Sequence, residues 1–307
     1  MCSKFMYRIY LNSISLIGVY LFVCLGFYDL QAFANTVIIN ADDREISLGQ
    51  ELRYYEDRDS SMSLDDFLHL ESQNLLLDSD RDQLSFGYTK SAYWFTVDFF
   101  YSGEINNSFI LELPKPLLDQ IDFYQISSGK KIKHNQLGDL LPYSMRIIDH
   151  RNFLIPVDFD SDKKLRLVFR IKTDNTLKVR LKLHEVSAFW ISDGREILFF
   201  GVFYGIMLVM IIYNSYISYT LKSRAYLYYV IYVLSNTIIS LSMSGFGYQY
   251  LWLENQFIQK RAIGASGCLG FFSLGYFTVL FLNVKTCFPW LKKIIVLLSI
   301  LLILIIP

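Results

Sequence analysis

The C-terminal part of the chain consists of long uncharged segments separated by short loops that carry lysine and arginine. Three segments, Ile197 to Leu221, Ala225 to Leu253 and Ala262 to Val284, exceed the roughly 20 residues with which an α-helix crosses a bilayer core. They predict membrane-spanning helices at about 197–221, 226–246 and 262–284. A fourth segment, 294–307, is too short for a complete crossing, so we expect a truncated gene product or a fragment.

Between residues 35 and 195 the pattern changes to short alternating stretches. Leu165–Lys172 and Leu177–Leu183 alternate apolar and polar residues around Thr173–Thr176, which predicts an antiparallel hairpin. Ser63 is expected to cap a short helix. Further strands are expected at Tyr93–Phe99, Phe109–Leu113, Ile121–Ile126 (followed by a turn at Ser128-Gly129) and Asn152–Val157. Many short strands with one small helix predict an all-β jelly roll or sandwich.

The N-terminus carries an export signal. Lys4 and Arg8 precede the uncharged stretch Ile9–Tyr28, and Ala32 to Ala34 supplies the small-x-small pattern of a cleavage site. This predicts a signal peptide at 1–34, with an uncleaved anchor helix as the alternative. Either form exports the β-rich domain, 35–195, ahead of a transmembrane domain at 196–307.

Charge is distributed unevenly although the chain has 29 basic and 29 acidic residues. Beyond Arg195 there are two acidic residues, Glu196 and Glu254, against seven basic ones. Five of these bases lie in the loops after the first and third segments: Lys222, Arg224, Lys285, Lys292 and Lys293. The positive-inside rule makes these loops cytoplasmic and puts the preceding domain on the outer side of the membrane. Lys260 and Arg261 lie in the outer loop and oppose this orientation, but they are outnumbered.

Small and amide residues mark the predicted helix contacts. The candidates for helix packing are Gly201, Gly205, Asn214, Asn236, Ser266 and Gly270. Small residues four apart let helices approach closely, and the two asparagines can donate across such contacts. The first three segments contain no charged residue and no histidine, which disfavours an ion-coupled transporter.

Motifs of catalysis are missing from the chain. It has no nucleophile elbow, paired metal-binding histidines, Cys-x-x-Cys or phosphate loop, so we expect neither an enzyme nor a cofactor or metal. Asp78, Asp80 and Asp82 resemble the start of a calcium loop, but Gln83 and Thr89 stand where glycine and glutamate are needed, which favours a solvated loop. The exported domain has no cysteine, so its core must form without disulfides. The surplus of basic residues beyond Arg195 lies in membrane loops rather than in a stripe on a soluble domain, so we expect no nucleic-acid partner.

Aromatic and arginine residues are the candidates for a ligand site. Rings stack on sugar faces, and guanidinium groups bind carboxylates or hydroxyls. The candidates are Tyr93, Trp94, Arg146 and Arg151. Adjacent residues of a strand point to opposite faces, so one of the two rings is expected in the core. Arg146 has an alternative role in an ion pair with Asp149 or Asp139.

Several stretches together resemble a known family. In the exported part they are Tyr93–Phe95, Leu113–Asp119 with Ile121–Tyr124, Gly138-Asp139 with Pro142 and Arg146, Arg151–Pro156, and Leu165–Leu183. In the membrane part they are Phe200-Gly201, Tyr204-Gly205, Tyr213-Asn214 and Arg224–Tyr229. In order and spacing, the chain resembles bacterial seven-transmembrane receptors with diverse intracellular signalling modules (7TMR-DISM), with their second type of extracellular domain.

The resemblance implies a jelly-roll sensor for a carbohydrate or similar small ligand, seven helices and a cytoplasmic output module. The chain departs from this plan because helices five to seven and an output module are missing. We therefore expect a sensory receptor module, with the lipid bilayer, a periplasmic small molecule and a cytoplasmic signalling protein as partners. The alternative is a membrane scaffold without signalling activity, or a degenerate receptor remnant.

Overall fold

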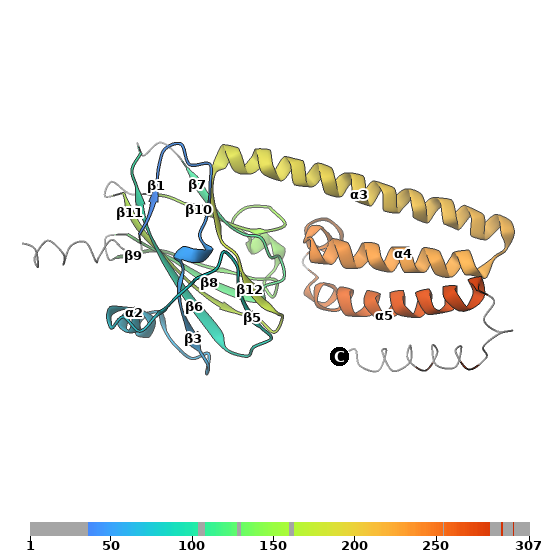
Figure 1. The fold of residues 1–307 in the computed structure, drawn as a ribbon, viewed down its shortest axis with the longest axis horizontal. Coiled ribbons are helices and arrows are strands. Elements are labelled where there is room, and N and C mark those ends of the chain that lie inside the picture. Colours follow the sequence, from blue (N-terminus) through green and yellow to red (C-terminus); the bar gives the residue numbers. More distant parts are fainter. Residues whose placement is uncertain are drawn as a thin grey trace, which may run out of the picture.

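The structure, a computed structural model, describes residues 36–103, 108–127, 130–159, 163–253, 255–282, 290 and 297. A β-rich body is followed by three long helices, which lie side by side and extend from one end of that body (Figure 1). The predicted signal peptide, the turn at Ser128-Gly129 and the fourth hydrophobic segment lie outside the described residues.

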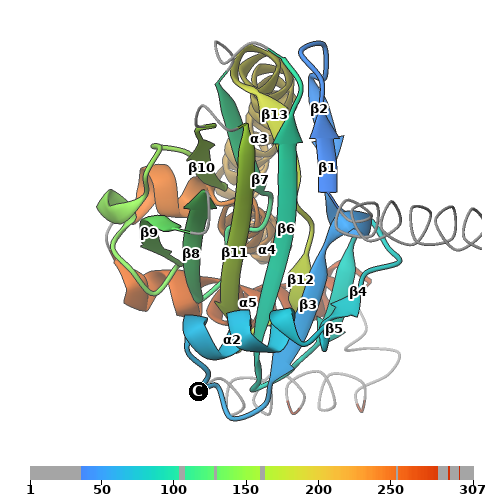
Figure 2. The same cartoon turned by 90° about the vertical axis from the view of Figure 1, so that its left-hand side faces the viewer.

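The larger sheet has seven strands (Figure 2). Its order is β4-β3-β6-β11-β8-β9, and β1 adds to β6 in parallel. The strands are β1 (Thr36–Ile39), β3 (Arg53–Asp57), β4 (Leu77–Asp78), β6 (Ala92–Tyr101), β8 (Gln120–Ser127), β9 (Lys130–Leu137) and β11 (Lys164–Lys172).

The smaller sheet has four strands in the order β10-β7-β13-β2. They are β2 (Glu45–Ser47), β7 (Phe109–Leu113), β10 (Phe153–Val157) and β13 (Lys182–Glu185). A separate pair joins β5 (Leu84–Gly87) to β12 (Leu177–Val179), and two single turns, η1 (Gly49–Glu51) and η2 (Tyr143–Met145), connect strands. The main core lies between the two sheets, so the predicted sandwich is confirmed.

Alternation along β6 explains both faces of the larger sheet. Phe95, Val97 and Phe99 point into the main core, where Phe95 stacks on Phe169 with 5.1 Å between ring centroids. Trp94 points to the opposite face and stacks on Phe67 of α2 (Leu64–Ser72) at 5.2 Å. The sheet is thus covered on both sides, and burial of these rings stabilises it by roughly 25 cal/mol per Å² of apolar surface.

The short helix begins where the sequence predicts. Ser63 is its N-cap: its hydroxyl accepts a hydrogen bond from the Asp66 amide, and the Asp66 carboxylate accepts one from the Ser63 amide. The reciprocal pair satisfies amides that a helix start otherwise leaves without partners.

The predicted hairpin is wrong. Its first half is β11, which pairs with β6 and β8, whereas its second half divides into β12 on β5 and β13 on β7 and β2. In the segment between β11 and β12, the Asp119 carboxylate accepts hydrogen bonds from the Thr173 hydroxyl and the Asp174 amide. Alternation predicted the first strand correctly, but neither the division of the second strand nor the partners of either.

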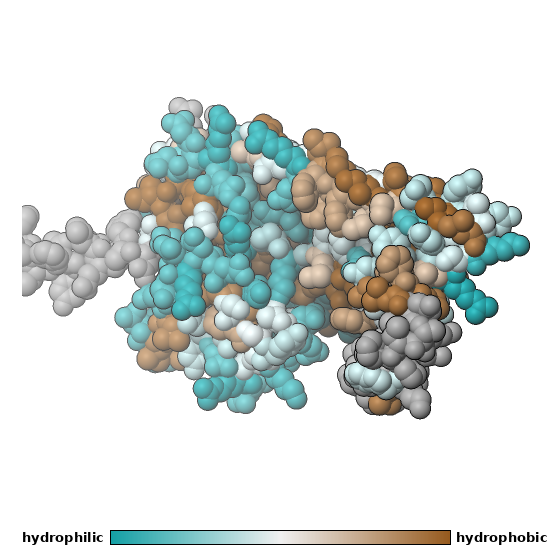
Figure 3. All heavy atoms as spheres, turned by 45° about the vertical axis from the view of Figure 1, so that its right-hand side comes forward, coloured by the Kyte–Doolittle hydropathy of each residue, from teal (hydrophilic) through white to brown (hydrophobic). Residues whose placement is uncertain are grey.

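Three helices are long and apolar enough to cross a membrane: α3 (Val186–Leu221), α4 (Arg224–Met243) and α5 (Gln256–Phe281). Hydrophobic side chains gather over them, whereas the sandwich surface is mainly hydrophilic (Figure 3). The first helix starts well before Ile197, because its first turns pack on the sandwich through Phe189. A π-helical turn, η3 (Gly247–Leu251), follows α4.

The predicted packing residues fall into two groups. Gly270 lies against α4, where an added Cβ would come within 3.3 Å of the Ser235 Cβ, and Ser266 on the same helix is buried. At Gly201 and Gly205 an added Cβ would meet no described atom within 4 Å, so the described helices do not support close packing there.

Both predicted asparagine contacts differ from the structure. The Asn214 amide donates to the Met210 carbonyl and the Asn236 amide to the Tyr232 carbonyl, each within its own helix. The polar link between α3 and α4 comes instead from the Tyr204 hydroxyl, 3.2 Å from Ser240 Oγ and 2.9 Å from Ser244 Oγ.

Candidate functional site

The junction of the sandwich with α3 is held by an ionic cluster that is buried apart from Glu196 at its edge. Arg151 lies before β10 and is only 3% exposed. Its Nη1 lies 2.7 Å from Asp193 Oδ1, and its Nη2 donates to Glu196 Oε2 at 2.6 Å. Both acids belong to the first turns of α3. An arginine that binds two carboxylates in this way ties the two elements in a specific geometry.

His150 completes the cluster from the sandwich side. Its Nδ1 accepts a hydrogen bond from the Asn152 amide at 3.1 Å, so the ring proton resides on Nε2. Nε2 lies 3.0 Å from Asp193 Oδ1 and donates to it. Asp193 therefore receives two donors, a neutral imidazole and a guanidinium, in a site that excludes most water.

A second buried network continues into the smaller sheet. A carboxylate oxygen of Glu112, on β7, lies 3.0 Å from Nε2 of His184. The other oxygen accepts a hydrogen bond from the side-chain Nδ2 of Asn152 at 2.7 Å. Burial raises the pKa of Glu112, but hydrogen bonds from the side chains of His184 and Asn152 outweigh it and leave the pKa below its ordinary value. The ring of Phe189 packs edge-on against both His150 and His184, which seals the networks under α3.

The turn after α4 makes a separate contact with the sandwich. The Tyr248 hydroxyl donates to the Leu141 carbonyl at 2.9 Å, and its ring packs edge-on against Tyr143. The side chain of Gln249 donates to Asp149 Oδ1 at 3.2 Å. Gly245 has φ +81°, a backbone conformation that favours glycine. A Cβ atom added at this position would lie only 2.8 Å from the Arg151 carbonyl oxygen, so glycine is required here.

Arg146, a predicted ligand contact, supports this second interface. Its Nη1 donates to the carbonyls of His150 and Arg151, both at 2.7 Å, and its guanidinium lies 4.4 Å from the Phe153 ring centroid. It forms no ion pair with either Asp139 or Asp149 in the described structure, so the predicted alternative is wrong. Arg146 and Arg151 thus lie side by side at the end of the sandwich that faces the helices, and both bind groups of the protein itself.

The two predicted rings lie elsewhere. Tyr93 is 7% exposed and belongs to the main core, whereas Trp94 is 1% exposed beneath α2. One of the two rings was expected in the core. Both are buried, because α2 covers the second face of the larger sheet as well. As ligand contacts, Tyr93 and Trp94 have no ring face open to solvent in this conformation.

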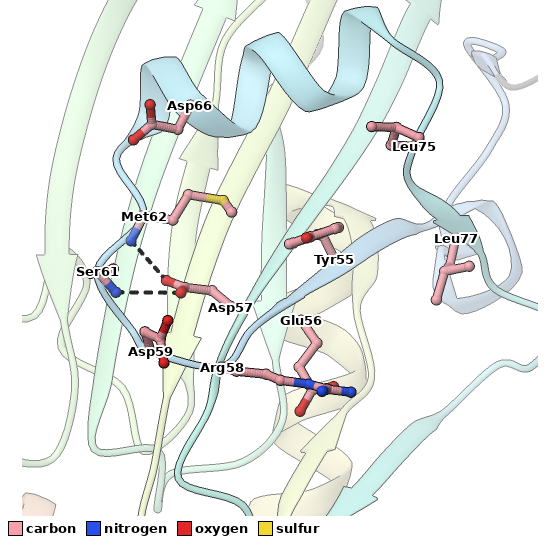
Figure 4. A pocket seen from close by; sticks show the side chains of 10 residues that line it. All are labelled: Tyr55, Glu56, Asp57, Arg58, Asp59, Ser61, Met62, Asp66, Leu75 and Leu77. Carbon is pink, nitrogen blue, oxygen red and sulfur yellow. Dashed lines mark hydrogen bonds and ion pairs between the residues drawn. The ribbon is translucent and has the colours of Figure 1, made fainter.

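An open groove of about 700 Å³ lies instead between the end of β3 and α2 (Figure 4). It is lined by Tyr55, Glu56, Asp57, Arg58, Asp59, Ser61, Met62, Asp66, Leu75 and Leu77. The Asp57 carboxylate accepts hydrogen bonds from the backbone amides of Ser61 and Met62, at 3.3 and 3.0 Å. Arg58 and Asp59 are exposed beside apolar side chains, a combination that suits a polar ligand with an apolar face.

Among the residues that the structure describes, no three histidine, cysteine or acidic side chains come together in a way that could hold a metal ion.

Comparison with protein families assigns the two halves of the chain. The model of 7TMR-DISM extracellular 2 matches residues 49–185, and the model of 7TM diverse intracellular signalling matches residues 196–307. The chain belongs to the 7TMR-DISM family. It is a multi-pass membrane receptor with an extracellular sensory domain.

Other comparisons add nothing to this. No curated protein matches the 7TMR-DISM chain. Among solved structures, the insecticidal δ-endotoxin Cry8Ea1 from Bacillus thuringiensis is 8% identical with a TM-score of 0.19, over 30% of this chain and 18% of that one. The 7TMR-DISM chain therefore spans less than a fifth of the endotoxin, and a likeness this low carries no argument.

The junction falls between the two family matches. The first match ends at Glu185, the last residue of β13, and α3 begins at Val186 without a loop. Asp193 lies between the matched regions and Glu196 opens the second. The sequence did not mark His150, Asp193 or Tyr248 as residues of this junction. The signal that could have indicated it is the pair of acidic residues, Asp193 and Glu196, just before the uncharged segment.

Proposed function

We propose that this receptor binds a small polyhydroxylated ligand, such as a carbohydrate, in its sandwich and transmits binding to the membrane helices through the start of α3. The role is one of binding and relay rather than enzymatic catalysis. A cytoplasmic signalling partner would detect the resulting change in helix packing.

The cluster of Arg151, His150 and Asp193 is the observation that carries this proposal. It joins the sandwich to α3 by buried charged groups, and β13 continues into the helix without a loop. A shift of the smaller sheet therefore moves the helix rather than being absorbed by a flexible linker. A ligand changes that equilibrium only if it binds one arrangement better than the other.

The groove beside α2 is the proposed ligand site. Carboxylates and Arg58 can bind hydroxyl groups, while Tyr55, Leu75 and Leu77 offer apolar contact to a sugar face. Its floor is β3, which pairs with β6, and β6 pairs with β11 across the larger sheet. A ligand there contacts the sheet that forms one side of the core.

The orientation belongs to the proposal as well. Lys222 and Arg224 lie at the turn between α3 and α4, at the end of α3 that is remote from the sandwich. The positive-inside rule then puts the sandwich in the periplasm and the helices in the inner membrane. A jelly-roll sensor and a cleaved signal peptide are part of the same proposal.

Ligand binding can be tested on the full chain in nanodiscs of zwitterionic lipid. Thermal stability is measured against a panel of neutral sugars and sugar acids. A binder is expected to raise the melting temperature with concentration. The variant Arg58→Gln with Asp59→Asn should weaken that response about tenfold, whereas the matched surface variant Arg44→Gln with Asp42→Asn should not change it.

The relay is tested with the same ligand. Hydrogen exchange of amides 186–196 should change on binding, and this change should be lost in Arg151→Met although the ligand still binds. A flat panel would contradict the sensor and favour a scaffold or remnant. Binding without any exchange change at α3 would contradict the relay alone.

A further inference from the structure

A second cavity, of about 240 Å³, lies on the sandwich away from the groove beside α2. Its charged side chains are Lys115, Lys178 and Arg180, and no acidic residue lines it. Leu113, Leu118 and Val179, which are almost wholly buried in the main core, also line it. Three cations in one cavity without a lining carboxylate are unfavourable unless an anion joins them.

Two of the cations share one face of β12 and its continuation. Leu177, Val179 and Leu181 are buried in the core, so Lys178 and Arg180 between them point outward together. In the part of the chain that the structure describes, neither cation forms an ion pair with a carboxylate. Both are free to bind an external group.

Lys115 supplies the third cation from the segment after β7. Its ammonium donates to the Thr176 carbonyl, which holds it beside β12. Burial lowers the pKa of Lys115 and the nearby charge of Lys178 lowers it further, while Asp119 acts in the opposite direction. Asp119 does not line the cavity, and its carboxylate already accepts from Thr173 and the Asp174 amide.

The cavity lies at the end of the sandwich that faces the membrane helices. Pro116, next to Lys115, is so close to Gly245 at the end of α4 that an added Cβ there would lie 2.9 Å from the Pro116 Cβ. Figure 1 shows the ends of β5 and β12 on the side of the sandwich toward α4 and α5. A group bound there would lie close to the lipid headgroups.

We propose that this cavity is a binding site for a phosphate group, either of a soluble phosphate compound or of an anionic lipid headgroup. Convergence of two ammonium groups and a guanidinium suits a tetrahedral phosphate group, whose several oxygens can accept from different donors, better than a single carboxylate. The site is distinct from the groove beside α2 and does not depend on that groove binding a sugar.

The test uses the full chain purified in a neutral detergent. Thermal stability is followed against inorganic phosphate, with sodium chloride at matched ionic strength as the reference. In parallel, retention of added phosphatidylglycerol and phosphatidylcholine is compared by native mass spectrometry. We expect a response to phosphate, selective retention of phosphatidylglycerol, or both, and the two arms distinguish the soluble from the lipid source.

The variant Lys178→Gln with Arg180→Gln should weaken whichever response is seen by about tenfold, because it removes two exposed charge-assisted contacts. The control Arg44→Gln with Lys90→Gln removes the same charge from exposed positions elsewhere on the sandwich and should leave the response unchanged. The proposal is overturned if neither probe binds, or if both variants weaken binding equally, because the effect is then one of net charge.

Discussion

Two helices dock on the sandwich through ionic clusters, and the clusters differ in composition. Under α2, Arg53 and Arg166 share two acids, Glu71 of the helix and Asp98 of β6. Under α3, Arg151 is the one guanidinium among the described residues that contacts Asp193, and the neutral ring of His150 donates to the same carboxylate. The α2 cluster therefore has a duplicated cation, and the α3 cluster does not.

The clusters also differ in what they connect. Residues of the α2 cluster all belong to the sandwich, and α2 covers the outer face of the larger sheet. The α3 cluster joins the sandwich to a helix that continues to Leu221 as a candidate membrane span. A duplicated cluster suits a platform beside a binding groove, whereas a cluster that depends on one arginine suits a link whose geometry can change.

The largest effect is expected from Arg151→Met. The change leaves Asp193 buried with a neutral imidazole as its remaining donor, and removal of one partner of a buried pair costs about 3–5 kcal/mol. Denaturant unfolding of the full chain in detergent measures the free energy of unfolding. Arg44→Met, at an exposed position, is the control, and equal stability of the two variants would contradict the role given to the cluster.

The next largest effect is expected from Asp139, a buried carboxyl group of the sandwich. It is 3% exposed, and burial, together with the charge of Asp119 and a hydrogen bond to it, raises the pKa of Asp139 to about 7 despite the charges of Lys260 and Arg146. The folded state thus binds a proton that the unfolded chain releases near pH 4, so stability is lost as pH rises through 7.

This loss should amount to about 2–3 kcal/mol between pH 5 and pH 8, from the relation of pKa to free energy. Unfolding across this range measures it. Glu112, whose pKa is lowered, acts with the opposite sign at lower pH, so the comparison is made between the native chain and Asp139→Asn. A pH dependence that is the same in both would rule out Asp139 as its source.

A smaller effect is expected from Arg53→Met under α2. Arg166 remains in contact with both Glu71 and Asp98, so the loss should be about 1–2 kcal/mol, below that of Arg151→Met. The same unfolding measurement applies. When Arg53 and Arg166 are both replaced, the loss in free energy of unfolding should exceed the sum of the losses of the two single variants. Simple additivity would show that the two arginines do not replace each other.

The smallest effect is that of Ser63→Ala, which removes the cap of α2. A lost N-cap costs about 1 kcal/mol. Because α2 borders the groove, the variant should also increase hydrogen exchange across residues 64–72 while that at 186–196 stays unchanged. Ser61→Ala, two residues before the cap, is the matched control. An effect that spreads equally to α3 would mean that the two docking regions are not separate.

Much of the fold was predictable because it depends on neighbouring residues. The uncharged segments predict the three helices, since transfer into lipid depends on each segment's own composition. Ser63 predicts the start of α2, and the strands expected at 93–99, 109–113, 121–126 and 152–157 are found as β6, β7, β8 and β10, because caps and short apolar stretches are local properties. The family resemblance, carried by many short stretches in order, was confirmed.

Pairing and partners were not predictable in this way. The strand after Thr173 pairs with β5 instead of returning to β11, and Thr173 itself donates to Asp119, more than fifty residues earlier in the chain. The sequence marks Arg146 and Arg151 as polar residues able to bind a ligand, but their contacts with carbonyls and with Asp193 arise only when α3 and η3 fold onto the sandwich. Hydrophobicity and capping are encoded within a few residues, whereas the partner of a buried charge is chosen by which distant segments meet.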